Sequence, residues 1–164
     1  MREFYCHARV EVKGESPEGS SEGRYIEGYA STKDLDRDAD VITPDAFAKT
    51  ITTFLKNPIV FFNHMWDEGI GTVERMSIDD KGLFVRIKIA EGTPLADKVW
   101  ALIKQGVYRA LSFGFRVLSY EDHREDRSTP YDRLITDLDL FEVSVVTVPA
   151  NGFPRAREDR PVLG

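Results

Sequence analysis

The chain has 164 residues, a formal net charge of −6 at pH 7, 41% hydrophobic residues and one cysteine. This length and apolar content fit one domain with a buried core. The negative charge excludes a dense basic face, so we expect no nucleic-acid partner. Cys6 cannot form an internal disulfide, which fits a reducing compartment. Without a long apolar run or a signal-peptide pattern at its start, the chain is expected to have no membrane partner.

Most of the chain is predicted to form strands. Alternating or short apolar runs predict seven or eight of them, at residues 4–12, 24–32, 59–63, 71–78, 83–90, 109–117, 132–137 and 141–148. The segment Asp79-Asp80-Lys81-Gly82 is typical of a hairpin turn between two of these strands.

Two helices are expected between the strands. The first begins at Pro44, with Thr43 as its N-cap, and the second covers Pro94 to Gln105 and ends at Gly106. This content favours an α+β, mainly β fold: a closed or nearly closed antiparallel β-barrel of about seven strands, with the helices packed outside. Residues 1–152 are assigned to this single domain, and the charged segment 153–164 to a flexible tail.

No metal or cofactor is predicted. Asp34, Asp36, Asp38 and Asp40 alternate as in a calcium-binding loop, but Ala39 stands where an EF-hand needs glycine for its sharp turn. Strands rather than helices precede this segment. A polar loop that leads to the first helix explains the aspartates better.

His64, Ser112 and Glu142 are the residue types of a serine hydrolase, and each lies in or beside a predicted strand. Alternation within 109–117 puts Ser112 on the side of its strand away from the core. The same alternation puts Glu142 on the non-core side of its own strand. His64 follows the apolar run 59–63, so we expect it to lie where that strand ends and the chain turns.

Each residue type also has a common structural role. A serine between small residues often fills a solvent face, and a glutamate beside an apolar strand often protects a sheet edge. A histidine at the end of a strand is often a turn residue. Catalysis requires that the three side chains converge in space.

Five segments carry a resemblance to a known family, and the span from Gly28 to Asn151 in which they lie covers about three quarters of the chain. They are GYASTKDLDRDADVITPDAF, VFFNHMWDEGIGTV, GLFVRIKI, VWALIKQGVYRALSFGF and DLFEVSVVTVPAN. In this order they resemble the prohead proteases of tailed bacteriophages, which are capsid-maturation serine proteases related to herpesvirus assemblins. The resemblance implies the assemblin architecture for this chain.

The resemblance also implies roles for the three candidate residues. His64 corresponds to the general base and Ser112 to the nucleophile. Glu142 stands where assemblins have a second histidine, and its carboxylate would orient the imidazole by accepting an N–H.

The oxyanion site departs from the family pattern. Assemblins have a paired-arginine segment there, whereas this chain has Pro149-Ala150-Asn151. Because proline has no N–H, the backbone N–H groups of Ala150 or Asn151 are expected to stabilise the oxyanion.

The expected function is that of a serine endopeptidase that cleaves scaffold and capsid-protein segments during prohead maturation, through an acyl-enzyme. The partners implied by the resemblance are the major capsid protein and its scaffold segment, and a second copy in a homodimer or higher homo-oligomer. The exposed side of the 94–105 helix is the candidate contact between copies. The expected location is the interior of the assembling prohead in the bacterial cytoplasm.

Two other functions remain open. A catalytically idle capsid assembly or scaffold module would keep the same fold for interaction alone. An esterase or amidase acting on small substrates would share the chemistry, but the residues around Ser112 lack the Gly-x-Ser-x-Gly pattern of a nucleophile elbow. The intact set of Ser112, His64 and Glu142 favours the protease over the idle module.

Overall fold

The computed structural model describes residues 3–9, 11–12, 23–31 and 40–148. The elements of this part, in chain order, are β1 (Glu3–Arg9), β2 (Glu11–Val12), β3 (Arg24–Ser31), β4 (Asp40–Ile42), the 3₁₀ helix η1 (Pro44–Phe47), α1 (Ala48–Phe54), β5 (Ile59–Phe62), β6 (Met65–Asp79), β7 (Gly82–Ile89), α2 (Pro94–Lys104), β8 (Ala110–Asp122) and β9 (Arg133–Val146). Within these ranges, neither helix combines the length and apolar character that crossing a bilayer requires. The predicted tail at 153–164 lies outside the described residues.

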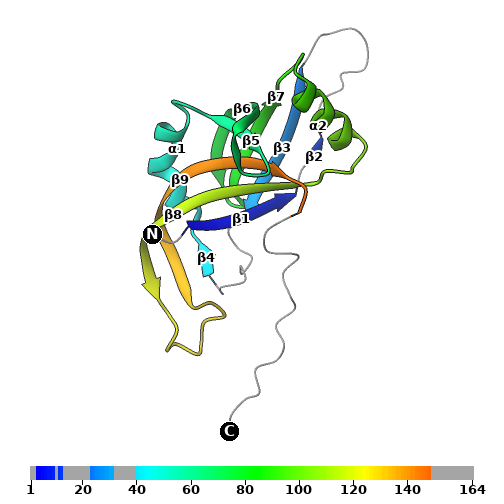
Figure 1. The fold of residues 1–164 in the computed structure, drawn as a ribbon. Helices are drawn as coiled ribbons and strands as arrows, with labels where there is room; N and C mark the ends of the chain where they lie inside the picture. The colour runs from blue at the N-terminus through cyan, green and yellow to red at the C-terminus, as the bar shows by residue number, and fades with distance from the viewer. Residues whose placement is uncertain (1–2, 10, 13–22, 32–39, 149–164) are drawn as a thin grey trace.

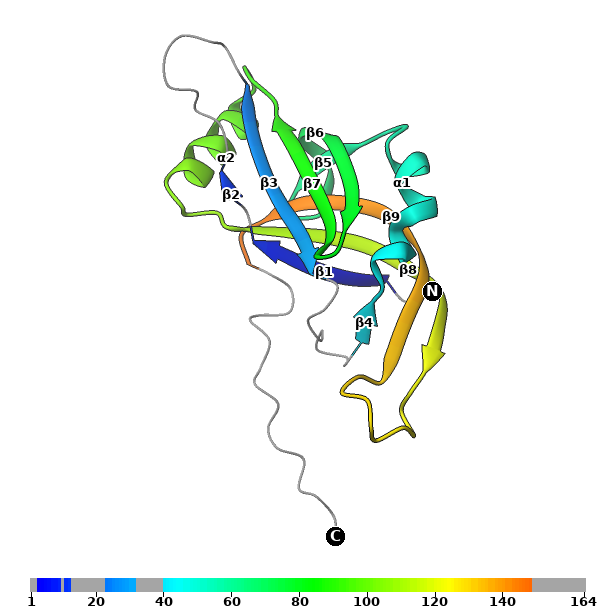
Figure 2. The same cartoon turned by 180° about the vertical axis from the view of Figure 1, so that it is seen from behind.

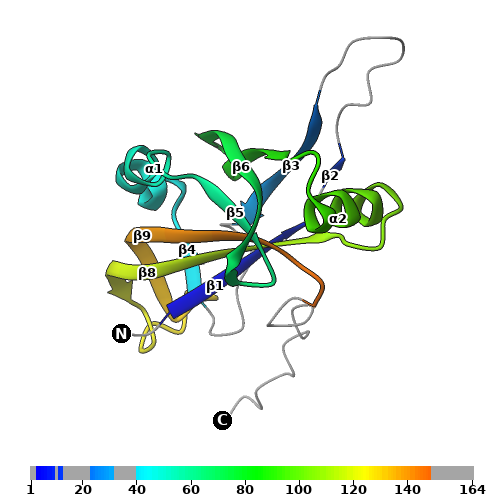
Figure 3. The same cartoon turned by 45° about the horizontal axis from the view of Figure 1, so that its top comes forward.

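The described strands form one mixed sheet of nine, in the order β1-β8-β9-β5-β6-β7-β3-β2, with β4 also paired to β9. Strands β1, β8 and β9 cross β3 and β7 at a steep angle (Figures 1 and 2). Helices α1 and α2 lie on opposite flanks of the sheet (Figure 3). Apolar side chains of both strand groups form the core, among them Ile26, Leu83, Val85, Ile87, Leu111, Phe113, Leu138 and Val143.

The expectation of a closed antiparallel barrel is wrong, although the mainly β fold with two helices is confirmed. The path of described strands ends at β1 and β2, and it does not close on itself. β1 pairs with β8 while β2 pairs with β3. Each therefore has one partner, and no ladder in the described part connects the two ends of the path. The sheet is mixed rather than antiparallel because β4 and β5 both run parallel to β9.

These parallel pairs arise from one helical insertion along the edge of β9. β4 pairs with Arg133–Ile135 at the beginning of β9, and β5 pairs with Val143–Val145 near its end. η1 and α1 bridge the gap between them. In the gap, the N–H of Leu140 donates to the Thr50 hydroxyl of α1 over 2.8 Å. The helix thus supplies the acceptor that a neighbouring strand would otherwise provide to this buried backbone group.

The local signals for both helices are largely confirmed. Pro44 begins η1 and Pro94 begins α2, where the missing N–H of proline removes no helical hydrogen bond. Thr43 does not cap with its side chain; its hydroxyl donates to the Ile135 carbonyl of β9 instead. Gly106 follows α2 with a φ of 72°, the left-handed conformation that commonly ends a helix.

Asp40, a member of the aspartate series, is used in an ion pair. Its buried carboxylate accepts bonds from both Nε and Nη2 of Arg133 on β9, the former over 2.8 Å. This bidentate pair satisfies the buried charge and holds β4 against β9. Asp34, Asp36 and Asp38 lie outside the described residues. Among those that are described, the His, Cys, Asp and Glu side chains form no group of three that could hold a metal ion.

Candidate active site

His64 lies at the second position of a two-residue turn between β5 and β6. Phe62 is opposite Met65 in the antiparallel pair, so Asn63 and His64 make the connection. Both have positive φ, 51° and 61°, as in a type I′ hairpin turn. A side chain with a Cβ costs about 1–2 kcal/mol in the left-handed helical region, and asparagine tolerates it better than most. The expected position of His64 at a strand end is confirmed, but the strain was not predicted.

This turn is tied to the end of β9. The Asn63 N–H donates to the Val145 carbonyl over 2.9 Å. The Asn63 side-chain oxygen accepts bonds from the N–H and the hydroxyl of Thr147, at 2.9 and 3.3 Å. Because Glu142 also lies on β9, these bonds fix the turn that contains His64 to the strand that contains the carboxylate.

Ser112 and Glu142 lie on the same face of adjacent strands. In the β8–β9 ladder, Ser112 is opposite Ser144 and Gly114 is opposite Glu142. The alternation had predicted that both candidates point away from the apolar side of their strands. This second face is nevertheless not a solvent face, since Ser112 and Glu142 are 0% and 1% exposed. The site is therefore built inside the protein and not on an open surface.

Gly114 leaves the space in which Glu142 sits. A Cβ at this position would lie 2.9 Å from the Phe141 ring and 3.1 Å from the Cβ of Glu142. The first distance is below those that real Cβ atoms show, so any other residue here would displace its cross-strand neighbours. Gly114, two positions after Ser112, thus makes room for the Phe141 ring and for the Cβ of Glu142.

His64 and Glu142 are in direct contact. Nδ1 of His64 lies 2.6 Å from Oε1 of Glu142, although the two residues are 78 positions apart in sequence. With the carboxylate ionised, Nδ1 carries the proton and donates, and Nε2 is the nitrogen that can accept one. The His64 side chain is 28% exposed, whereas that of Glu142 is 1% exposed. A buried carboxylate in contact with a partly accessible imidazole is the arrangement that the acid and the base of a catalytic triad require.

Ser112 is the third candidate, and its hydroxyl is not bonded to His64 in this structure. Ser112 Oγ is buried without a hydrogen-bond partner in the part of the chain that is described. Most buried polar side-chain atoms do have a partner, so an exception requires an explanation. The structure thus brings His64 and Glu142 together, and places Ser112 on the same face one strand away.

Ser144 is a polar residue of this site that the sequence analysis did not single out. Its hydroxyl donates to Oε1 of Glu142 over 2.7 Å, and the side chain is fully buried. The alternation that placed Glu142 also places Ser144 on the same face, so the period of two could have identified it. Ala150 and Asn151, the expected oxyanion donors, lie outside the described residues.

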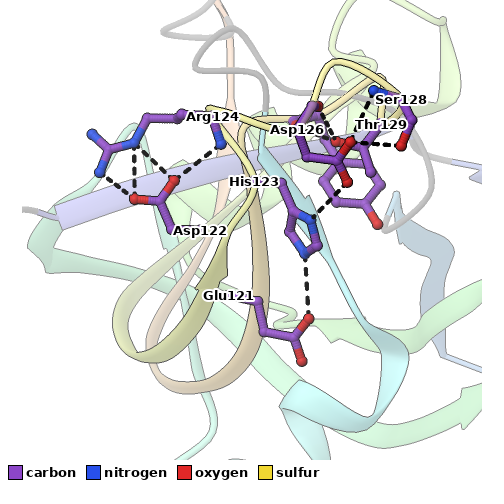
Figure 4. Close-up of polar contacts among 8 residues, drawn as sticks. Glu121, Asp122, His123, Arg124, Asp126, Ser128 and Thr129 are labelled. Atoms are coloured by element: carbon purple, nitrogen blue, oxygen red, sulfur yellow. Dashed lines mark hydrogen bonds and ion pairs between the residues drawn. The ribbon is translucent and has the colours of Figure 1, made fainter.

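A second polar cluster lies at the far end of the β8–β9 hairpin (Figure 4). His123 lies 3.3 Å from Glu121 and 3.9 Å from Asp126. Hydrogen bonds from the side chain and the backbone N–H of Arg124 lower the pKa of Asp122 to about 2. The bonds within this cluster are local, because they join residues two or three positions apart. They order the hairpin tip and include none of the three candidate residues.

Comparisons with known proteins show that this chain is similar to phage capsid proteases. A family model described as "Caudovirus prohead serine protease" matches residues 10–158. The prohead protease of Escherichia phage T5 is 37% identical over 142 residues, which are 85% of this chain and 63% of that protein. The prohead protease of Enterobacteria phage HK97 is 32% identical over 137 residues, 81% of this chain and 59% of that protein. The chain thus spans about three fifths of the length of these two relatives.

Two further likenesses concern the capsid polyprotein and the fold. The capsid polyprotein of Pseudomonas phage PAJU2 is 34% identical over 178 residues, which cover 100% of this chain and 25% of that protein. Among solved structures, the bacteriophage T4 capsid assembly protease matches with a TM-score of 0.65 at 17% identity. That match covers 88% of this chain and 97% of the T4 chain. At this identity the T4 likeness supports the fold alone.

Proposed function

The chain belongs to the caudovirus prohead serine protease family, and on this premise we propose that it is a serine endopeptidase with Ser112 as nucleophile, His64 as general base and Glu142 as the orienting acid. The observation that carries the proposal is the 2.6 Å contact between His64 Nδ1 and Glu142 Oε1. With Nδ1 in contact with the carboxylate, Nε2 is the ring nitrogen that would take the proton, which is the task of the base in acyl transfer.

The proposed reaction proceeds in two stages. Nε2 of His64 takes the Ser112 hydroxyl proton while Oγ attacks the scissile carbonyl. The tetrahedral intermediate collapses when His64 returns the proton to the leaving amine, which leaves an acyl-Ser112 ester. His64 then deprotonates a water that attacks the ester, and the proton passes to Ser112 as the acid product leaves. Glu142 stabilises the imidazolium in both stages.

The unbonded hydroxyl of Ser112 fits this scheme as a site before substrate binds. Catalytic hydrogen bonds are often long or unmade without substrate and form in the Michaelis complex. A buried hydroxyl that lacks a competing acceptor is free to turn toward Nε2. The backbone N–H groups of Ala150 or Asn151 are proposed as oxyanion donors.

The proposed substrates are capsid-protein and scaffold segments inside the assembling prohead. Support comes from the names of the relatives, two of which are prohead proteases and one a capsid polyprotein with a segment similar to this chain. A homodimer or higher homo-oligomer that uses the exposed side of α2 remains part of the proposal.

A catalytically idle capsid assembly module is the second candidate. Two observations favour it: Ser112 is fully buried without a bond to His64, and one relative is named a capsid polyprotein rather than a protease. In this function the polar pair of His64 and Glu142 would serve only to fix the β5–β6 turn against β9.

A cleavage time course separates the two functions. Wild-type protein, Ser112→Ala and the control Ser77→Ala, which changes a strand serine on β6, are each mixed with the cognate capsid precursor, and the products are followed by mass spectrometry. Discrete cuts by wild type and Ser77→Ala, but not by Ser112→Ala, support the protease. If Ser112→Ala cuts at the wild-type rate, or no variant cuts while all bind the precursor, the proposed mechanism is wrong.

A further inference from the structure

We propose that Ser144 is a positioning residue of the active site, which holds the Glu142 carboxylate in the orientation that His64 requires. The inference rests on the proposed function, because it assigns a task within the same site. It adds a fourth side chain to Ser112, His64 and Glu142.

The contact is specific to one carboxylate oxygen. Oε1 of Glu142 receives the Ser144 hydroxyl at 2.7 Å, and the same Oε1 lies 2.6 Å from Nδ1 of His64. The two donors therefore converge on the atom through which the acid acts on the base. Because Ser144 follows Glu142 by two positions on β9, the strand itself places both side chains on one face.

Burial makes this second donor important. Ser144 is 0% exposed and Glu142 is 1% exposed, so the surroundings of the carboxylate are protein rather than bulk water. A buried carboxylate is costly unless hydrogen-bond donors stabilise it. A glutamate has several rotatable bonds, and one donor from a turn on another strand leaves its carboxyl group free to pivot. The second donor, the Ser144 hydroxyl on the same strand, restricts this rotation and holds the carboxyl group in one orientation.

Ser144 also lies beside the proposed nucleophile. It is the direct cross-strand partner of Ser112 in the β8–β9 ladder. Its hydroxyl is engaged by Glu142, whereas Ser112 Oγ has no partner in the described part of the chain. The Ser144 hydroxyl thus donates to the carboxylate and not to Ser112, its cross-strand neighbour. Ser144 thus acts through Glu142 and not on the substrate.

A double-mutant cycle on peptide cleavage tests this assignment. Ser144→Ala should lower kcat about tenfold, the effect of one lost hydrogen bond of ordinary strength, with little change in KM. In a Glu142→Gln background the same change should cost less than about twofold, because groups that act as a unit are not additive. Ser144→Thr keeps the hydroxyl on a residue suited to a strand and should retain most of the activity. Ser77→Ala is the matched control.

Two results of the cycle would overturn the proposal. One is a Ser144→Ala enzyme with wild-type kcat, and the other is an equal loss with and without Glu142. If Ser144→Ala does not fold, Ser144→Cys replaces it, since a thiol fills the space but donates weakly. Thermal unfolding of each variant identifies losses that come from the fold alone.

A readout without catalysis keeps this test separate from the proposed function. The Nδ1 proton of His64 is followed by NMR in wild type, Ser144→Ala and Ser77→Ala. We expect the resonance to move upfield and exchange faster with water in Ser144→Ala only. An unchanged resonance overturns the role of Ser144 even if the wild type cleaves. If the resonance changes in Ser144→Ala but the wild type cleaves nothing, the result supports the effect of Ser144 on the contact between Glu142 and His64 and contradicts the proposed protease function.

Discussion

Two consecutive hairpins of this sheet place positive φ on different kinds of residue. In the β6–β7 turn, Asp79 is opposite Gly82, and the positive φ of 135° falls on that glycine. In the β5–β6 turn, positive φ falls on Asn63 and His64. Glycine adopts such angles at no steric cost, whereas histidine does not. In the first turn the positive φ falls on a residue that adopts it without strain. In the second turn it falls on two residues with a Cβ, one of which is His64.

The contacts of the two turns agree with this difference. In the β6–β7 turn the Lys81 N–H donates to Asp79 Oδ1 over 2.8 Å, and the Tyr29 hydroxyl of β3 donates to Asp79 Oδ2 over 2.7 Å; neither Asp79 nor Lys81 has a positive φ. The β5–β6 turn is held by β9, through Val145, Thr147 and Glu142. Backbone strain persists where the surrounding structure over-determines it, and such positions cluster at functional sites. The strained β5–β6 turn therefore agrees with the proposed role of His64.

The largest expected difference between the turns is in catalysis. His64→Ala should lower kcat/KM for the capsid precursor by about 10³-fold or more, because it removes the proposed base. Lys81→Ala, in the other turn, should stay within about twofold of wild type. Initial cleavage rates by mass spectrometry measure both. Equal losses in the two variants would mean that hairpin integrity, and not the imidazole, limits the reaction.

A smaller effect is expected from added bulk opposite Glu142. Gly114→Ala should lower the cleavage rate about tenfold to a hundredfold, since small displacements of reacting groups are costly. It should also lower the free energy of unfolding by about 1–3 kcal/mol through overpacking. Gly69→Ala is the control, because its Cβ would meet only Ile59 Cγ2 at 3.4 Å, an ordinary contact. A fully active Gly114→Ala enzyme would show that Glu142 need not keep its place.

The strain itself can be measured by comparing glycine with alanine at both turns. His64→Gly should unfold with a free energy about 1 kcal/mol higher than His64→Ala, because φ at this position is 61°. At Lys81 the order should reverse by about 0.4–1 kcal/mol, since alanine restricts the unfolded chain without a strained native angle. Denaturant titrations of the four variants give both differences. The same order at both positions would remove the contrast between the turns.

The smallest effect concerns acid stability of the β6–β7 turn. The Tyr29 hydroxyl, and after it the Lys81 N–H, lowers the pKa of Asp79 below its ordinary value. A carboxyl whose pKa is lower in the folded state stabilises the fold at pH values above its unfolded pKa of about 3.9. This stabilisation is lost as the pH falls through the folded pKa. Tyr29→Phe should raise the Asp79 pKa and weaken this acid dependence. An NMR titration of Asp79 from pH 6 to 2, in the wild type and in Tyr29→Phe, measures the two pKa values. Identical midpoints would contradict the role of the Tyr29 hydroxyl.

Much of the local structure could be predicted from the sequence because its signals are local. Pro44 and Pro94 mark the helix starts, Gly106 marks a helix end, and the Asp79–Gly82 segment is a hairpin turn. Each of these signals depends on the φ preference of one or two residues. The hydrogen bonds of Ser144 and Asn63 could not be predicted in this way. Alternation puts Ser144 on the face of Glu142 but does not show that its hydroxyl donates to the carboxylate, and Asn63 accepts bonds from Thr147, which is 84 positions away.

The sequence by itself determined the residue types of the candidate site and the face of the strand that carries each one, because a period of two is written into the chain. Only the tertiary structure decided that the sheet is open and mixed, since strand pairing depends on long-range contacts. It also decided that His64 meets Glu142 across 78 positions, and that the face they share is buried. Distances between side chains so far apart in the chain follow from how the elements pack, and no local pattern encodes that packing.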